Sequence, residues 1–147
     1  MILRKNAEIE FLNFAFTVPG GLNLEGEINE GLAFVIKSPN SAWDLQICTD
    51  REPYNPETVF SETLNDDQFK VTIDRRAVSH GGLCGFMMAY EDGSHQYCEY
   101  QFELEGDEHN KVLNLRLEVP KAAGDSEKIA QLVMVSELLA SIRKIEK

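Results

Sequence analysis

The chain has 147 residues, of which 43% are hydrophobic and 27% are charged, which is typical of a single globular domain over residues 1–147 and excludes a disordered chain. Its 25 acidic and 14 basic side chains give a formal net charge of −11, and so negative a surface repels phosphate backbones, which excludes nucleic acid as an expected partner. No apolar run approaches the roughly 20 residues that span a bilayer, so we expect no membrane insertion.

The expected compartment follows from the first residues and the cysteines. The segment MILRKNAEIEFLNFAF contains neither a long apolar core nor a small-residue cleavage motif, so it predicts no signal peptide. Three cysteines, an odd number, favour reduced thiols when no leader precedes them. We therefore expect a cytoplasmic protein.

Three segments in the first third of the chain have strand character. Residues 11–19 alternate loosely and run into a Pro-Gly-Gly turn. Residues 31–38 form a short apolar run, which is typical of a strand buried on both faces. Residues 42–50 alternate clearly, with Leu45 and Ile47 on one side.

A short helix is predicted over residues 55–64. Asn55 can cap its first turn, Pro56 suits the first helical position, and Glu57 complements the positive end of the helix dipole. Strand character returns over residues 68–78.

The segment AVSHGGLCGFMMAYEDGSHQYCEY, residues 77–100, is interpreted as a β-hairpin with Asp92-Gly93 as its turn. The glycine pair that follows His80 is interpreted as a bend or bulge and not as a phosphate loop, because a strand follows it where a phosphate loop requires a helix. Pairing Tyr90 with His95 places Cys98 and Met87 on one face. The opposite face then carries Cys84, Phe86, Met88, Tyr90 and Tyr97.

Two further strands are predicted at residues 97–105 and 112–120, because both segments alternate strictly between apolar and polar side chains. Pairing Leu104 with Leu113 brings the apolar positions of both strands onto one face, which makes this register self-consistent.

A long helix of about 20 residues is predicted over residues 126–147. Ser126 can cap it, and basic residues gather at its C-terminal end, where they complement the dipole. The expected apolar face consists of Ile129, Leu132, Val133, Leu139 and Ile142.

Strands and helices do not alternate along the chain, which favours an α+β fold. We expect an antiparallel sheet of about six to seven strands, with the short mid-chain helix and the long C-terminal helix packed on one face of it.

The order of elements and four short segments resemble the Mog/PsbP-like fold, whose members include the Mog proteins, PsbP subunits, DcrB lipoproteins and the Eag-type adaptor chaperones of type VI secretion. The four segments are FAFTVP-GG near the start, ETVFSETL in the short helix, HGGLCGFMMAY in the following strand, and LLASIRKI in the last helix. The tryptophan often expected soon after the first Val-Pro-Gly of these families is absent. The resemblance implies a binding or adaptor protein without a shared catalytic constellation.

The cysteines and histidines, which could bind a metal or act in catalysis, predict neither a metal site nor a cofactor. No two cysteines have the tight spacing that anchors zinc, and Cys84 and Cys98 fall on opposite faces of the predicted hairpin. Cys84 with His80 is the candidate nucleophile and base, but an extended strand would separate the two by roughly 13 Å. Packing is the more usual role of a free cysteine, so we expect no enzyme.

The predicted partner-binding residues are Phe86, Met88, Tyr90 and Tyr97, because helices on one side of the sheet would leave these apolar side chains on the open side. We expect a non-catalytic cytosolic adaptor or chaperone that holds a protein segment, with an Eag-like adaptor for a secreted effector as its most concrete form. Three alternatives stay open: a small enzyme that uses the Cys84 thiol with His80, a self-associating domain or homodimer, and a face covered by the chain's own segments.

Overall fold

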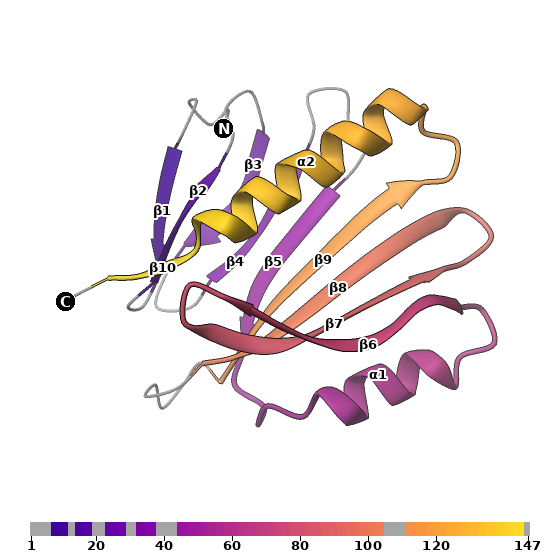
Figure 1. Ribbon diagram of the computed structural model, residues 1–147, viewed down its shortest axis with the longest axis horizontal. Coiled ribbons are helices and arrows are strands. Elements are labelled where there is room, and N and C mark those ends of the chain that lie inside the picture. Colours follow the sequence, from indigo (N-terminus) through magenta and orange to yellow (C-terminus); the bar gives the residue numbers. More distant parts are fainter. Residues whose placement is uncertain are drawn as a thin grey trace.

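The fold is that of a computed structural model, which describes residues 7–11, 14–18, 23–28, 32–37, 44–104 and 111–145. Two antiparallel sheets and two helices make up these residues (Figure 1). The larger sheet has seven strands in the order β3-β4-β5-β9-β8-β7-β6. Their bounds are β3 Asn23–Ile28, β4 Leu32–Lys37, β5 Asp44–Asp50, β6 Lys70–His80, β7 Leu83–Glu91, β8 His95–Glu103 and β9 Val112–Pro120.

The smaller sheet has three strands in the order β1-β2-β10, and its bounds are β1 Ala7–Phe11, β2 Phe14–Val18 and β10 Arg143–Lys144. The helices are α1 Pro56–Leu64 and α2 Asp125–Ser141. The α+β class and the mostly antiparallel pairing are confirmed. The total number of strands was predicted too low, because the sequence pattern predicts one sheet and the described residues form two.

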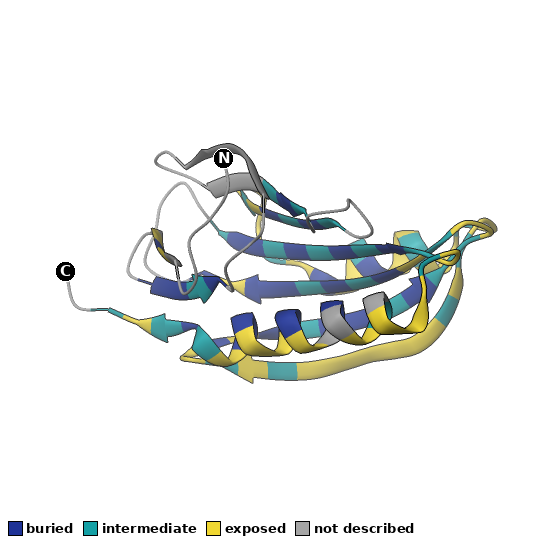
Figure 2. Ribbon diagram, turned by 90° about the horizontal axis from the view of Figure 1, so that it is seen from above, coloured by how far each residue is buried: buried dark blue, intermediate teal, exposed yellow. Residues whose placement is uncertain are grey.

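The main core lies between α2, β2 and one face of the large sheet, which we name the α2 face. This face presents Leu45 and Ile47 of β5 and the leucines of β9 to the helix. Helix α2 contributes its buried stripe, Met134, Val135, Leu138 and Leu139. Figure 2 shows this stripe turned toward the sheet, while the outer side of α2 and most of β6 are exposed.

The two helices pack on opposite faces of the sheet, so the prediction that both lie on one face is wrong. Phe60 of α1 packs against Met88 of β7, whereas the neighbouring residue, Met87, projects to the α2 face. We name the side that carries Met88 the α1 face. Helix α1 itself begins as predicted, with the Asn55 side chain accepting a hydrogen bond from the Thr58 amide at 3.3 Å.

Helix α2 is shorter than predicted and its apolar stripe is rotated. It ends at Ser141, because Arg143 and Lys144 pair with β2 as a strand and cannot continue the helix. The side chains of Ile129 and Val133, expected in the core, are 62% and 51% exposed. They lie on the side of the helix opposite Met134 and Leu138, which face the sheet.

Two registers differ from the prediction by two residues. Tyr90 pairs with Tyr97 and not with His95, and Phe102, not Leu104, pairs with Leu113. A shift of two residues keeps each side chain on its predicted face, because strand side chains alternate with a period of two. The predicted division of β7 and β8 into two faces is therefore confirmed.

At its start the chain forms a hairpin where one strand was expected over residues 11–19. Strands β1 and β2 pair with Ile9 opposite Phe16, and β10 adds to the free side of β2. The Ser141 hydroxyl holds the end of α2 to the same strand, since it accepts a hydrogen bond from the Thr17 amide at 2.8 Å. Strand β3 was not predicted.

The tip of the β6–β7 hairpin docks against the end of α2. Gly81 and Gly82 form a two-residue turn with φ angles of +56° and +90°. A Cβ atom on Gly81 would lie 1.8 Å from the backbone oxygen of Ile142, whereas one on Gly82 would meet nothing within 4 Å. Only glycine therefore allows the hairpin tip to approach the C-terminal end of α2 this closely.

We expect Gly81→Ala to lower the free energy of unfolding by about 1–3 kcal/mol more than Gly82→Ala, because only the first adds a clash to the cost of a positive φ. Urea denaturation of the two variants and the wild type measures the difference. Equal losses would show that the hairpin tip does not contact α2.

Candidate functional site

The four predicted binding residues do share the α1 face, but helix α1 covers three of them. Met88 is fully buried and Tyr90 and Tyr97 are nearly so, and all three pack with Phe60 of α1. Phe86 is half-buried at the edge of the same cluster. Whether these residues bind a partner stays a prediction, and the structure shows that the chain's own helix occupies most of this surface.

The cluster beneath α1 has the ring geometry and polar pairing of a permanent core. The Tyr90 ring lies 5.0 Å from the rings of Phe69 and Tyr97, in edge-to-face and stacked arrangements respectively. The Tyr90 hydroxyl donates a hydrogen bond of 3.1 Å to the buried carboxylate of Glu99. Burial, and then this carboxylate, raise the pKa of Tyr90, which keeps its hydroxyl protonated as a donor.

We expect Phe60→Ala to lower the free energy of unfolding by about 3–5 kcal/mol, since it removes the one α1 ring buried against Met88 and Tyr90. The matched variant Leu64→Ala truncates an α1 side chain that is 50% exposed and should change stability by less than about 0.5 kcal/mol. Chemical denaturation distinguishes the two. If both variants lowered the free energy of unfolding by the same small amount, α1 would not be packed firmly against the sheet.

Cys84 and His80 do not form a catalytic pair. Cys84 projects to the α1 face with Ser79, whose hydroxyl lies 3.8 Å from its sulfur. His80 is opposite Leu83 in the register, and its ring packs 6.1 Å from Phe102 on the α2 face. Among the described residues, no group of three or more His, Cys, Asp or Glu side chains is placed to hold a metal ion.

The three thiols should differ in reactivity at pH 8. Cys84 is exposed, whereas burial raises the pKa of Cys98, and burial together with Asp50 raises that of Cys48. We expect iodoacetamide to modify Cys84 first and Cys98 last, with the sites separated by peptide mapping.

The variant His80→Ala should leave the Cys84 rate unchanged, because the two side chains lie on opposite faces of the hairpin. A drop of about ten-fold or more would show that His80 activates the thiol after all.

The uncovered apolar surface lies on the other side of the same strands, on the α2 face. Along one row of paired residues, β9 contributes Leu117, β8 Cys98, β7 Ala89 and β6 Ile73. Leu117 is buried under α2, Cys98 and Ala89 are half-buried, and Ile73 is 36% exposed. Along this row, the cover provided by the α2 core therefore decreases from β9 to β6.

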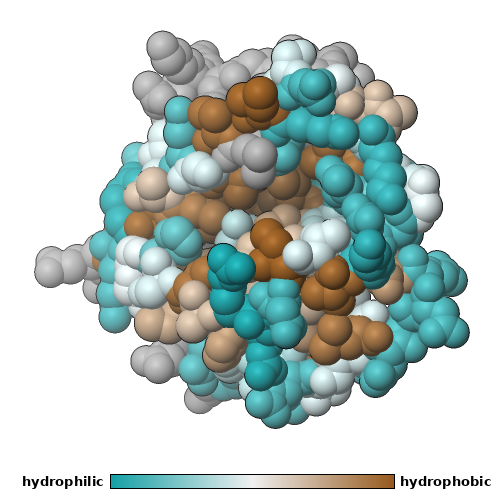
Figure 3. Space-filling model, turned by 45° about the vertical axis from the view of Figure 1, so that its right-hand side comes forward, coloured by the Kyte–Doolittle hydropathy of each residue, from teal (hydrophilic) through white to brown (hydrophobic). Residues whose placement is uncertain are grey.

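In the next row, Leu115 on β9 and Met87 on β7 are buried, and Tyr100 on β8 between them is half-buried. We name this surface the α2-face groove; its residues are Ile73, Met87, Ala89, Cys98 and Tyr100. Figure 3 shows that the molecule is hollowed on this side, with apolar side chains at the floor of the hollow and on its borders.

The groove owes its shape to β6 and to the hairpin tip. The register of β6 against β7 shifts at two points, between Val71 and Ile73 and between Ile73 and Arg76, and such bulges bend a strand. The contact of Gly81 with Ile142 holds the far end of the bent hairpin at α2. In Figure 1 the β6–β7 hairpin tip lies beside the C-terminal end of α2, which places the tip at one end of the groove.

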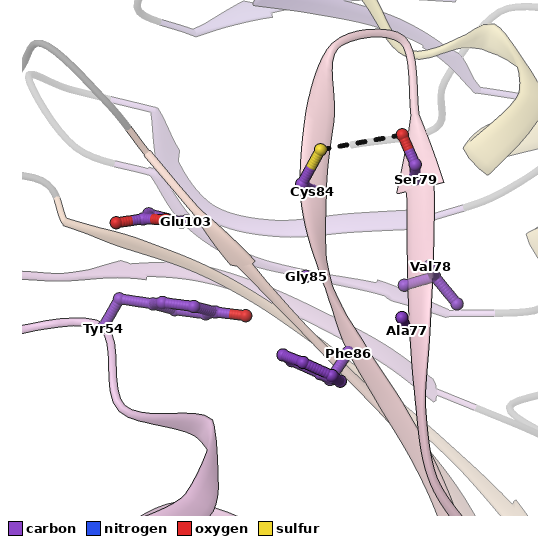
Figure 4. Close-up of a pocket in the computed structure, with 8 residues that line it drawn as sticks. All are labelled: Tyr54, Ala77, Val78, Ser79, Cys84, Gly85, Phe86 and Glu103. Atoms are coloured by element: carbon purple, nitrogen blue, oxygen red, sulfur yellow. Dashed lines mark hydrogen bonds between the residues drawn. The ribbon is translucent and has the colours of Figure 1, made fainter.

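A cavity of about 460 Å³ lies on the α1 face next to the aromatic cluster, and Phe86 belongs to the borders of both (Figure 4). Strands β6 and β7 and the residues before α1 form it. Its lining consists of Tyr54, Ala77, Val78, Ser79, Cys84, Gly85, Phe86 and Glu103. Gly85 is required here, since a Cβ atom would lie 1.9 Å from the Gln101 backbone oxygen. Phe86 is thus the one predicted binding residue that lines this cavity.

Neither the groove nor the cavity was predicted as such. Every residue of GFMMAY after its glycine is apolar, so β7 is apolar on both sides. This pattern alone could have indicated a second apolar surface. Tyr54 carries no pattern that would place it at a cavity with Cys84.

Comparison with known proteins identifies the fold and no family. No family model matches the chain, and no curated protein matches it in sequence. A search of solved structures finds LpqN, a protein involved in cell envelope biogenesis of Mycobacterium tuberculosis, at a TM-score of 0.62 and 15% identity over 90% of this chain and 83% of LpqN. A structure from Bacteroides thetaiotaomicron matches at a TM-score of 0.49 and 15% identity, over 92% of this chain and 46% of that one. The chain therefore shares the fold of LpqN, and its place in the Mog/PsbP-like group stays a prediction.

Proposed function

We propose that the protein is a non-catalytic binding protein that holds an apolar segment of a partner protein in the α2-face groove. The observation that carries this proposal is the gradient of exposure along one row of the sheet, from buried Leu117 on β9 through half-buried side chains on β8 and β7 to Ile73 on β6, which is 36% exposed. Contiguous apolar surface on a sheet face is stabilised when a partner covers it.

The side chains of the groove suit an apolar segment of varied sequence. Met87 can adapt its shape to different neighbours, and Tyr100 offers a flat ring. Arg76, exposed on β6 opposite Met87, is a charged border residue that can meet the polar end of such a segment. Burial raises the pKa of Cys98 at the floor, so its thiol stays protonated and unreactive, in keeping with a role in contact and not in chemistry.

In its most concrete form, the proposal is an adaptor that keeps a segment of a secreted effector from aggregating, as the resemblance to Eag-type chaperones implies. A cytoplasmic location belongs to this form of the proposal. Among the described helices none is long and apolar enough to cross a membrane. The role of LpqN in cell envelope biogenesis is a property of that protein, and at 15% identity it supports the fold alone.

Two positions make a matched pair for the test. Ile73 lies in the groove and is 36% exposed, and Leu64 lies on the outer side of α1 on the opposite face and is 50% exposed. The photo-crosslinking amino acid p-benzoylphenylalanine at Ile73 should yield adducts with an apolar segment of a partner in native cells, and at Leu64 it should not. Mass spectrometry of the adducts identifies the segment.

The charge variants Ile73→Asp and Leu64→Asp separate binding from folding. We expect Ile73→Asp to weaken capture of the crosslinked partner by about ten-fold or more, because a charge would be desolvated in the complex, while Leu64→Asp leaves capture unchanged. Circular dichroism confirms that both variants fold. If the adducts at Ile73 join only copies of this chain, the adaptor proposal is wrong and the protein is self-associating.

A further inference from the structure

We infer that the cavity beside Cys84 is a second binding site, and that it takes a small uncharged aromatic molecule with a hydrogen-bond acceptor oxygen. Its volume of about 460 Å³ falls within the range of small-molecule sites, which runs from about 300 to 1,000 Å³. The cavity lies on the α1 face and shares none of its lining residues with the α2-face groove.

The lining is mainly carbon. Phe86 and Tyr54 approach each other from different elements, and Ala77 of β6, paired with Phe86, adds to the apolar wall (Figure 4). The small polar groups of Ser79 and Cys84 interact with each other at 3.8 Å and leave that wall without a strong donor. Two aromatic rings at one opening favour a flat aromatic ligand, which can stack or pack edge-on against them.

Tyr54 supplies the polar contact. Its hydroxyl oxygen is shielded from solvent and has no hydrogen-bond partner among the residues that the structure describes. Burial and the neighbouring Glu103 carboxylate raise the pKa of Tyr54, so the hydroxyl is a donor that lacks an acceptor. The Tyr54 side chain is half-buried, and Figure 4 shows its hydroxyl directed toward the strand segment of Gly85 and Phe86, which lines the cavity.

The charges around the cavity oppose each other. Glu103 is part of the lining, and the Arg75 guanidinium, which pairs with Glu57 at 3.5 Å, lies 5.3 Å from the centre of the Phe86 ring. Because Arg75 is already paired with Glu57 and Glu103 is exposed to solvent, neither charge is placed to compensate the desolvation of a charged ligand. An uncharged ligand incurs no such cost.

Cys84 reports occupancy of the cavity, because its exposed thiol is part of the lining. Acetophenone is the probe, since it is uncharged, aromatic and carries one carbonyl oxygen. We expect acetophenone, at a concentration that occupies about nine-tenths of the sites, to slow alkylation of Cys84 by iodoacetamide about ten-fold. Cys48, on β5 and outside the lining, should react at an unchanged rate. Benzoate and benzylammonium at the same concentration should protect neither thiol.

Two variants test the geometry. Ala77→Trp fills the cavity from the exposed strand β6 and should abolish protection, and Tyr54→Phe keeps the ring but should raise the acetophenone concentration needed for protection several-fold. The inference is overturned if acetophenone slows Cys48 and Cys84 equally, or if protection survives in both variants. The Tyr54→Phe result decides the question by itself if Ala77→Trp does not fold.

Discussion

The close contact between the β6–β7 hairpin tip and the end of α2 is the constraint on which the described surfaces depend. Gly81 approaches the Ile142 backbone oxygen at a distance that no side chain would allow. The same end of α2 is tied to β2 by Ser141 and continues into β10, with Arg143 forming an ion pair with Glu8. One junction therefore joins the helix, both sheets and the long hairpin, and it fixes the end of the groove that lies between them.

The alternation of a single strand gives the molecule two different apolar sides. Met87 and Met88 are neighbours in β7, yet Met88 is buried under α1 and Met87 belongs to the α2-face groove. Helix α1 uses the first side to complete a small aromatic core, which leaves Phe86 at the border of the cavity. Along the row from Leu117 to Ile73 the second side becomes more exposed from β9 toward β6, and this difference is the physical basis for the proposed binding function on the α2 face.

Local chemistry was predictable from the sequence, and tertiary packing was not. The Asn55 cap, the Asp92-Gly93 turn and the alternating faces of β7 and β8 follow from residue type and period, and they are present. A register error of two residues left each side chain on its predicted face. The face that α1 covers depends instead on where the chain crosses the edge of the sheet, and the hydrophobic periodicity of the sequence carries no information about that crossing. The end of α2 was missed because Arg143 and Lys144 gain strand pairing with β2, a contact 126 or more residues distant in sequence that overrides their helix propensity.

The most direct test of the account is an NMR titration of the two adjacent methionine methyl groups with a lysine-flanked leucine–alanine peptide as the apolar segment. The chain has only four methionines, so ¹³C-methyl labelling resolves them readily. Binding in the α2-face groove predicts a shift of the Met87 methyl signal, while Met88 beneath α1 keeps its position. A shift of Met88 with Met87 unchanged would contradict the account, because it would place the binding surface on the α1 face.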